Sequence, residues 1–145
     1  MSRQWVVIAH RSGARIFLRH GASMQLEPVA TLSHAAGHLQ EREFNSDRPG
    51  RTHDSAGPGR HAMGAENTAR EHSAEQFASE ISERLEAGRT AHAYAQLVLV
   101  AEPHMLGVLR AALSKQCTAL VSASVTKDLV HVPDDELMSH LASEL

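Results

Sequence analysis

An unbroken apolar run near the N-terminus, Trp5 to Ala9 (WVVIA), limits the folds that are open to this chain. A strand that is apolar at every position must bury both of its faces, so the run predicts a central strand of a sheet. Ser12-Gly13 is a turn signal, and residues 14–19 (ARIFLR) predict a second strand that forms a hairpin with the first. The N-terminal part of the chain is therefore expected to build the middle of a sheet.

A third strand is predicted over residues 25–33 (QLEPVATLS), with Leu26, Ala30 and Leu32 on one face. Pro28 has no N–H to donate to a neighbouring strand, so we expect this strand either to lie at an edge of the sheet or to start late.

A long helix is predicted from about Asn67, with Gly88 as its stop, because an apolar stripe repeats there at helical spacing. The stripe consists of Ala74, Phe77, Ala78, Ile81 and Leu85. Thr68-x-x-Glu71 and Ser73-x-x-Gln76 both fit the capping-box pattern, which marks the start of a helix.

The C-terminal half continues with alternating elements. Residues 96–101 (QLVLVA) predict a strand, Pro103 opens a helix, residues 119–125 (ALVSASV) predict another strand, and Pro133 opens a last helix. A helix between two apolar strands implies a right-handed parallel crossover. Residues 1–145 are thus expected to form a single α/β domain. Its mixed sheet of about five strands carries helices on its faces, in the order βββ-loop-αβαβα.

The long aperiodic segment, residues 34–64, interrupts this pattern. Loops of such length are uncommon inside compact domains, where they are either disordered or functional. Its second part, residues 45–64 (NSDRPGRTHDSAGPGRHAMG), is rich in Gly, Pro and Arg. We interpret this part as a binding loop, since long ordered loops commonly carry function.

Eight residues of this loop are candidate binding residues: Asp47, Arg48, Pro49, Gly50, Arg51, Asp54, Arg60 and His61. Pro49-Gly50 predicts a turn that brings the two flanking arginines together, and Gly57-Pro58-Gly59 predicts a second turn. Arginine side chains beside a helix N-terminus suit a phosphate group. The loop is therefore predicted to bind an anion, and we assign no catalytic residue.

Composition narrows the classes of function. The net charge of -3 gives no argument for bulk nucleic-acid binding, although a local basic patch stays open. Twelve arginines stand against two lysines, which indicates either anion contacts or an arginine-biased genome. Cys117, the only cysteine, is placed at the edge of a buried strand and interpreted as a small apolar residue rather than a nucleophile.

Several sites and segments are not indicated. The N-terminal apolar run is too short for a signal peptide or a membrane span, so we expect a cytoplasmic protein without membrane contact. The P-loop, GxGxxG, HExxH and GxSxG motifs are absent. His34 with His38, and His53-Asp54 with His61, lack diagnostic ligand spacing, so we expect no metal and no cofactor.

Several segments together resemble the bacterial "host attachment" proteins over nearly the whole chain. These are WVVIAH with ARIFLR, Arg42-Glu43-Phe44 before SDRPGR, Asp54-Ser55 with GPGRHAM, EHSAEQFASEISERLE, LVLVAEPHMLGVLRAAL and KDLVHVPDDEL. The family name implies a role in attachment to host cells. A literal adhesin would need an exit route, and no signal peptide or anchor is visible in the sequence.

That family is also similar to the middle domain of eukaryotic and archaeal class-one peptide-release factors and of related ribosome rescue factors. In release factors the loop before the long helix carries a Gly-Gly-Gln tripeptide, and residues 45–64 occupy the equivalent place. This chain contains no Gly-Gly-Gln, so hydrolysis of peptidyl-tRNA is not implied. The resemblance implies a non-enzymatic protein that contacts ribosome or tRNA phosphates through the loop.

Two other functions stay open on the sequence. The first is a hydrolase of a phosphoester or acyl ester, in which Asp47, Asp54 and His61 act as acid-base or metal groups. The second is a protein-interaction module linked to host attachment, with a protein partner. The sequence predicts no oligomeric state.

Overall fold

Five strands form one mixed sheet in the computed structural model, which describes the backbone of residues 2–34 and 58–145 and the side chains of all of these except 58–67. The strands are β1 (Arg3–Ala9), β2 (Gly13–His20), β3 (Glu27–Ser33), β4 (Gln96–Ala101) and β5 (Val121–Thr126). Their order in the sheet is β3-β2-β1-β4-β5. β1 pairs antiparallel with β2 and parallel with β4, and β5 pairs parallel with β4, so the predicted hairpin and parallel crossover are confirmed.

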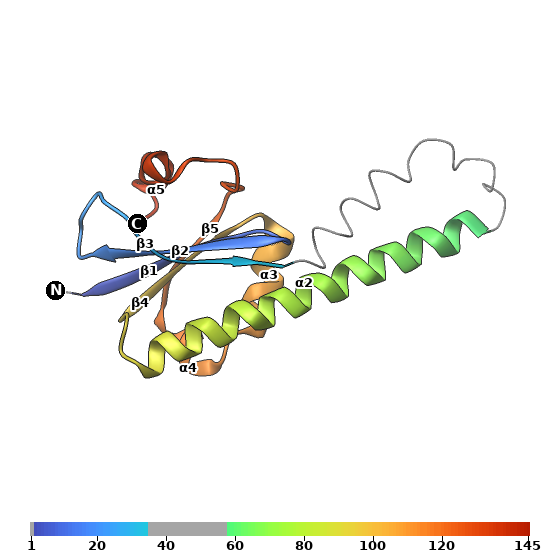
Figure 1. Ribbon diagram of the computed structural model, residues 1–145, viewed down its shortest axis with the longest axis horizontal. Helices are drawn as coiled ribbons and strands as arrows, with labels where there is room; N and C mark the ends of the chain where they lie inside the picture. The colour runs from blue at the N-terminus through green and yellow to red at the C-terminus, as the bar shows by residue number, and fades with distance from the viewer. Residues whose placement is uncertain (1, 35–57) are drawn as a thin grey trace.

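Helices cover both faces of this sheet (Figure 1). The long helix α2 (Pro58–Thr90), α3 (Pro103–Ala112) and α4 (Lys115–Leu120) pack on one face. A 3-10 turn (Asp134–Glu136) leads into the short helix α5 (Leu137–Leu141), which packs on the other face. The chain is a single mixed α/β domain, as the sequence predicts.

The central strand β1 divides the core into two layers. Trp5 and Val7 face α2, whereas Val6 and Ile8 face α5, and the exposed fraction of each of these side chains is 5% or less. An apolar residue at every position is what a strand covered on both faces requires. The central position predicted from the sequence is therefore confirmed.

Strand β3 lies at an edge of the sheet, where the missing N–H of Pro28 costs no ladder hydrogen bond. Its pairing with β2 shifts between Ile16 and Phe17, so that Val29 is the extra residue of a β-bulge. The bulge exchanges the two faces of the sheet to which the side chains that precede Val29 point. Ala30 packs toward α2, but Leu26 packs toward the other layer, so the prediction of one shared face is wrong for Leu26.

The start of α2 corrects the sequence interpretation. The helix begins at Pro58, so residues 58–64 are helical and do not belong to the predicted loop. Proline suits the first helical position, where its missing N–H has no partner to lose. The apolar stripe from which the helix was predicted begins only at Ala74, and the helix before it projects beyond the sheet (Figure 1). The two capping-box patterns lie inside α2, so neither marks the start of a helix.

The segment after α3 also differs from the prediction. Residues 119–125 were expected to form a strand, but α4 continues to Leu120 and β5 begins at Val121. Ser114 caps α4, because its Oγ accepts a hydrogen bond from the Cys117 N–H at 3.1 Å. Cys117 therefore lies in a helix and not at a strand edge, although it is fully buried as expected.

Candidate functional site

The predicted binding residues fall largely outside the part of the chain that the structure describes. Six of them lie in the undescribed segment: Asp47, Arg48, Pro49, Gly50, Arg51 and Asp54. Arg60 and His61 lie in the first turn of α2, with only their backbone described. The turn expected at Gly57-Pro58-Gly59 is wrong for its last two residues, which are helical. Convergence of the arginines stays a prediction.

Helix α2 is the element that positions this segment. Its 33 residues give a length of about 50 Å at 1.5 Å per residue. The helix rests on the sheet through its C-terminal half, and its N-terminal half projects past the end of the sheet (Figure 1). A helix N-terminus carries partial positive charge and unpaired N–H groups. The arrangement holds such an end away from the core.

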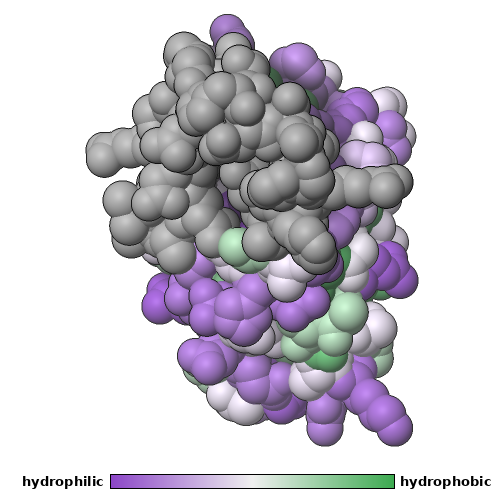
Figure 2. Space-filling model, turned by 90° about the vertical axis from the view of Figure 1, so that its right-hand side faces the viewer, coloured by the Kyte–Doolittle hydropathy of each residue, from purple (hydrophilic) through white to green (hydrophobic). Residues whose placement is uncertain are grey.

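Figure 2 views the molecule from the end at which α2 projects. Hydrophilic residues make up most of the described surface that is visible there, with a small group of hydrophobic residues among them. The figure therefore shows no large hydrophobic patch on the described part of this face. Within the described residues, no helix combines the length and the apolar character that a bilayer crossing needs.

His34, the last described residue before the gap, is anchored against the middle of α2. Its backbone N–H donates to the Ser12 carbonyl at 3.0 Å, and its ring stacks on Phe77 with centroids 5.1 Å apart. Its Nε2 lies 3.1 Å from Ser73 Oγ, and its Nδ1 lies 3.6 Å from Glu80 Oε1. These contacts fix the point from which residue 35 departs.

The contacts of His34 also bear on the hydrolase alternative. Serine, imidazole and carboxylate stand in the order that hydrolytic enzymes use. However, Ser73 is only 4% exposed, so its hydroxyl has no route to a substrate, while Glu80 is half exposed. Acyl transfer needs an accessible serine and a buried acid, and here the serine is buried and the acid is exposed. The three side chains therefore serve as an anchor for α2. The alternative site at Asp47, Asp54 and His61 stays untested, since none of those side chains is described.

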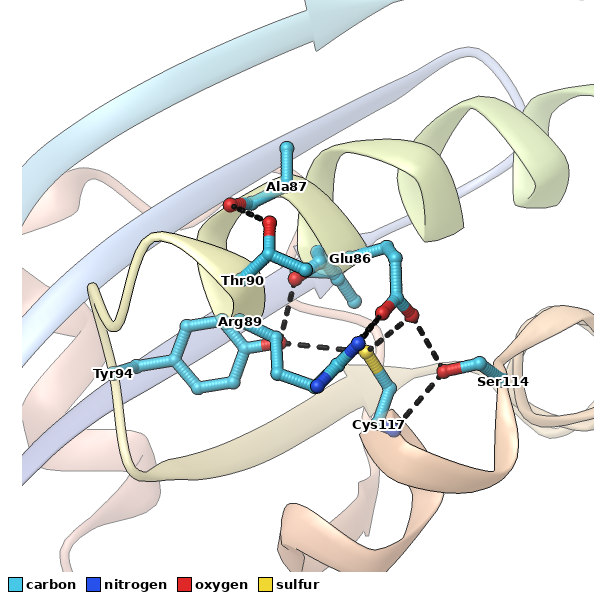
Figure 3. Close-up of polar contacts among 8 residues, drawn as sticks. Glu86, Ala87, Arg89, Thr90, Tyr94, Ser114 and Cys117 are labelled. Carbon is cyan, nitrogen blue, oxygen red and sulfur yellow. Dashed lines mark hydrogen bonds and ion pairs between the residues drawn. The ribbon is translucent and has the colours of Figure 1, made fainter.

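The C-terminal end of α2 is held by a second polar cluster, centred on Glu86 (Figure 3). The Glu86 carboxylate accepts hydrogen bonds from Arg89, with Nε at 2.7 Å, and from Ser114 Oγ at 2.6 Å. The hydrogen bonds from Arg89 and then from Ser114 hold the pKa of Glu86 below its ordinary value. The pKa of Arg89 is raised by the same pair. The cluster ties α2 to the cap of α4.

Tyr94 completes this cluster. Its hydroxyl donates to the Leu85 carbonyl at 2.6 Å and lies 3.4 Å from Cys117 Sγ. Burial is the main cause that raises the pKa of Tyr94, so the phenol stays neutral and remains a donor. Its ring packs on Trp5, with centroids 4.7 Å apart. Together the two clusters fix α2 at its middle and at its C-terminal end.

Neither anchor was found from the sequence. Ser73 was interpreted as a cap and His34 as part of a loop, because their contact joins residues 39 positions apart. Glu86 carries one local signal, since Arg89 follows it at a helical spacing of three, but nothing local indicates Ser114.

Comparisons with known proteins give a family and a fold. A family model described as "Protein required for attachment to host cells" matches residues 5–141. Among curated proteins, none matches the sequence significantly. The crystal structure of the archaeal translation termination factor aRF1 is similar, with a TM-score of 0.53 and 11% identity, over 99% of this chain and 35% of that chain. A structure described as an archaeal protein has a TM-score of 0.48 and 12% identity, over 97% and 36%.

At these identities the structural likeness concerns the fold alone, and this chain spans about a third of the length of either neighbour. The resemblance to the host attachment proteins is confirmed by the family match. The resemblance to release factors is confirmed as a likeness of fold.

Proposed function

This chain belongs to the family of proteins described as required for attachment to host cells, its fold is like that of an archaeal release factor, and we propose that it is a cytoplasmic, non-enzymatic binding protein that contacts ribosome or tRNA phosphates through residues 45–64. The proposal assigns the contact to Arg48, Arg51 and Arg60. Asp47, Asp54 and His61 add polar contacts, and Gly50 allows close approach of the backbone.

The observation that carries this proposal is the length and anchoring of α2. The helix begins at Pro58, so its first turns form the last part of segment 45–64, and its C-terminal half is fixed to the sheet and to α4. Because the C-terminal half of α2 is fixed, the projecting N-terminal half presents the contact segment to a large partner without a clash between that partner and the sheet. Nucleic-acid affinity rests mainly on phosphate contacts, and the guanidinium fork of arginine matches a phosphate in two hydrogen bonds.

Binding without hydrolysis of peptidyl-tRNA is proposed because the chain lacks the Gly-Gly-Gln tripeptide on which the release-factor route depends. Phosphate contacts need donors and close backbone approach, and the loop supplies both through its arginines and glycines.

Co-sedimentation with ribosomes over a series of salt concentrations tests the proposal. We expect the wild type to pellet with ribosomes at low salt and an Arg48→Ala/Arg51→Ala double variant to pellet less. Each lost phosphate contact should reduce the log–log salt slope by about 0.7 to 0.9, because fewer counterions are released. Arg84→Ala is the matched control, since Arg84 is an exposed arginine near the other end of α2.

The proposal fails if the wild type is absent from the ribosomal fraction at low salt. It also fails if the double variant and the wild type pellet equally with the same salt slope. A loss of binding in Arg84→Ala equal to that of the double variant would show a general charge effect and would likewise contradict the assigned loop.

The family description favours a second candidate function, a protein-interaction module that serves host attachment. Here the same arm would bind a protein. Nuclease treatment separates the two proposals, because a protein partner stays bound after the RNA is digested whereas ribosomal association is lost.

A further inference from the structure

A groove lies between α2 and α3, which pack side by side on one face of the sheet (Figure 1). Its volume is about 590 Å³, and its lining comes from residues 71–79 of α2 and 103–112 of α3. Each of these stretches covers about two helical turns, or roughly 12 to 14 Å of helix axis. The groove therefore follows both helices and has the length of a short helical segment.

Two contacts between the helices mark the ends of the groove. At one end, His104 Nε2 lies 2.8 Å from Glu71 Oε2. At the other, the Ser82 hydroxyl donates to the Ala112 carbonyl at 2.9 Å. Residue numbers rise from the first contact to the second in both helices, so α2 and α3 run in the same direction here. Glu75 lies between the two contacts on α2 and lines the groove.

The floor of the groove is apolar and low, because α3 places small side chains there. Gly107 and Ala111 are exposed and stand one turn apart. Val108 and Ala112 lie beside them and pack partly against the core. A methyl group built on Gly107 would meet nothing within 4 Å, so the space above it is open. Small residues one turn apart let another helix approach α3 closely, since the side chains at a contact set the distance between two helices.

The wall that α2 provides is acidic. Glu71 and Glu75 stand one turn apart, and no lysine or arginine occurs among the described residues that line the groove. Glu71 already contacts His104, whereas Glu75 is exposed and its carboxylate has no hydrogen-bond or ion-pair partner within the described part of the chain. Two carboxylates against one imidazole leave the lining negatively charged even when His104 is protonated.

The shape and the charge of the groove together select the kind of partner. An amphipathic helix binds by laying its apolar face into a hydrophobic groove, and a low floor between two helical ridges suits such a face. Carboxylates one turn apart match lysine or arginine side chains at i and i+4 of that helix. The same carboxylates repel phosphate groups, so the groove does not extend the proposed RNA contact.

We propose that the groove between α2 and α3 binds a basic amphipathic helix of a partner protein. Small or apolar side chains of that helix pack on Gly107 and Ala111, and a lysine or arginine pairs with Glu75. This site lies outside residues 45–64 and goes beyond the proposed function, because its partner is a protein and its charge is of the opposite sign.

An NMR titration of the ¹⁵N-labelled full chain tests the site with two synthetic peptides. Both have about 15 residues, enough for a helix in an alanine-rich sequence, and both carry the same face of Ala and Leu. One has lysines at i,i+4 spacing beside this face, and the other has glutamates at the same positions. We expect saturable shifts with the lysine peptide, confined to residues 71–82 and 103–112, and none with the glutamate peptide.

Variants separate the groove from general attraction to an acidic surface. Gly107→Leu should still fold, because the space above Gly107 is open, and should weaken the lysine peptide by about tenfold or more by filling the floor. Glu75→Gln should weaken it by about two- to fivefold, as expected for an exposed ion pair. Glu83→Gln removes the same charge from an exposed position of α2 outside the groove and should bind like the wild type.

The proposal is overturned by any of three binding results: no saturable shift with the lysine peptide, equal binding of the glutamate peptide, or full binding retained in a folded Gly107→Leu. Equal losses in Glu75→Gln and Glu83→Gln would also contradict it. Sedimentation velocity tests the other occupant, since a dimer that Gly107→Leu abolishes would assign the groove to a second copy of the chain. The Arg48→Ala/Arg51→Ala variant should bind the lysine peptide like the wild type, so failure of the groove and failure of the RNA contact are distinguishable.

Discussion

Single residues at the C-terminal end of α2 are set by close packing and backbone conformation. Gly88 was predicted to stop the helix, but α2 continues to Thr90. Instead, Gly88 lies against the rings of Trp5 and Tyr94, where a methyl group would approach Trp5 Cη2 to 2.5 Å. The reversal falls on His92, whose φ of 57° is left-handed. The Ala93 N–H then reaches the Gly88 carbonyl at 2.8 Å, which closes the helix as a Schellman motif does.

Gly88→Ala is expected to lower the free energy of unfolding by about 1–3 kcal/mol, because the added methyl overpacks a rigid ring contact. Urea unfolding of both proteins measures the change. Gly107→Ala in α3 is the matched control. Nothing lies within 4 Å of its added methyl, so it should gain about 0.5–1 kcal/mol from helix propensity. A Gly88→Ala variant as stable as the wild type would contradict the packing described for Trp5.

At the scale of elements, α2 is held to α4 by polar groups and to the sheet by apolar ones. The apolar stripe is buried along one side of the helix, as its spacing predicts. The polar link from Glu86 to Ser114 connects residues 28 positions apart and also stabilises the cap of α4. Glu86 is 34% exposed, so its contribution is moderated by solvent. Its carboxylate nevertheless accepts the hydrogen bonds from both Arg89 and Ser114.

Glu86→Gln is expected to lower the melting temperature at neutral pH, and the difference from the wild type should shrink in acid. The pKa of Glu86 is lowered by folding, so the stabilisation is present above its ordinary value of 4.5 and is lost as the pH falls below it. Melting curves of both proteins between neutral pH and about pH 3 measure this. Glu83→Gln, an exposed change on the same helix, is the control. A difference that stays constant with pH would contradict a role for the carboxylate charge.

At the scale of the whole molecule, the two halves of the chain meet at the centre of the sheet. β1 pairs with β4 across 92 positions of sequence, from Gln4 with Gln96 onward. The larger apolar cluster contains residues of β1 and β2 together with residues of α2, α3 and α4. Each half therefore leaves an open central strand and an exposed core when it is alone.

Fragments 1–50 and 51–145 are consequently expected not to fold separately, and to restore a native-like spectrum when mixed. The cut lies in the predicted loop, outside every strand and helix of the described residues. Circular dichroism and thermal melts of each fragment and of the equimolar mixture check this. A cooperative melt of either fragment alone would mean that the sheet does not depend on the β1–β4 pair.

Much of the fold was readable from local pattern. The buried central strand, the edge position that Pro28 requires, the apolar stripe of α2 and the α/β class all follow from periodicity over a few residues, and all are confirmed. The early turns of α2 were missed because the apolar spacing begins only at Ala74. The bulge at Val29 was missed because alternation carries no sign of an inserted residue.

The eight candidate binding residues remain a prediction of the sequence, resting on their residue types and on the family resemblance. The contacts that anchor α2 could not be predicted in the same way. His34 with Ser73, Glu86 with Ser114, and Gly88 with Trp5 are far apart in the chain, and only the packing of α2 against the sheet and α4 brings them together. Local sequence fixes which elements form because periodicity acts over a few residues; contacts between elements depend on strand order, and for this chain that order came from the folded sheet.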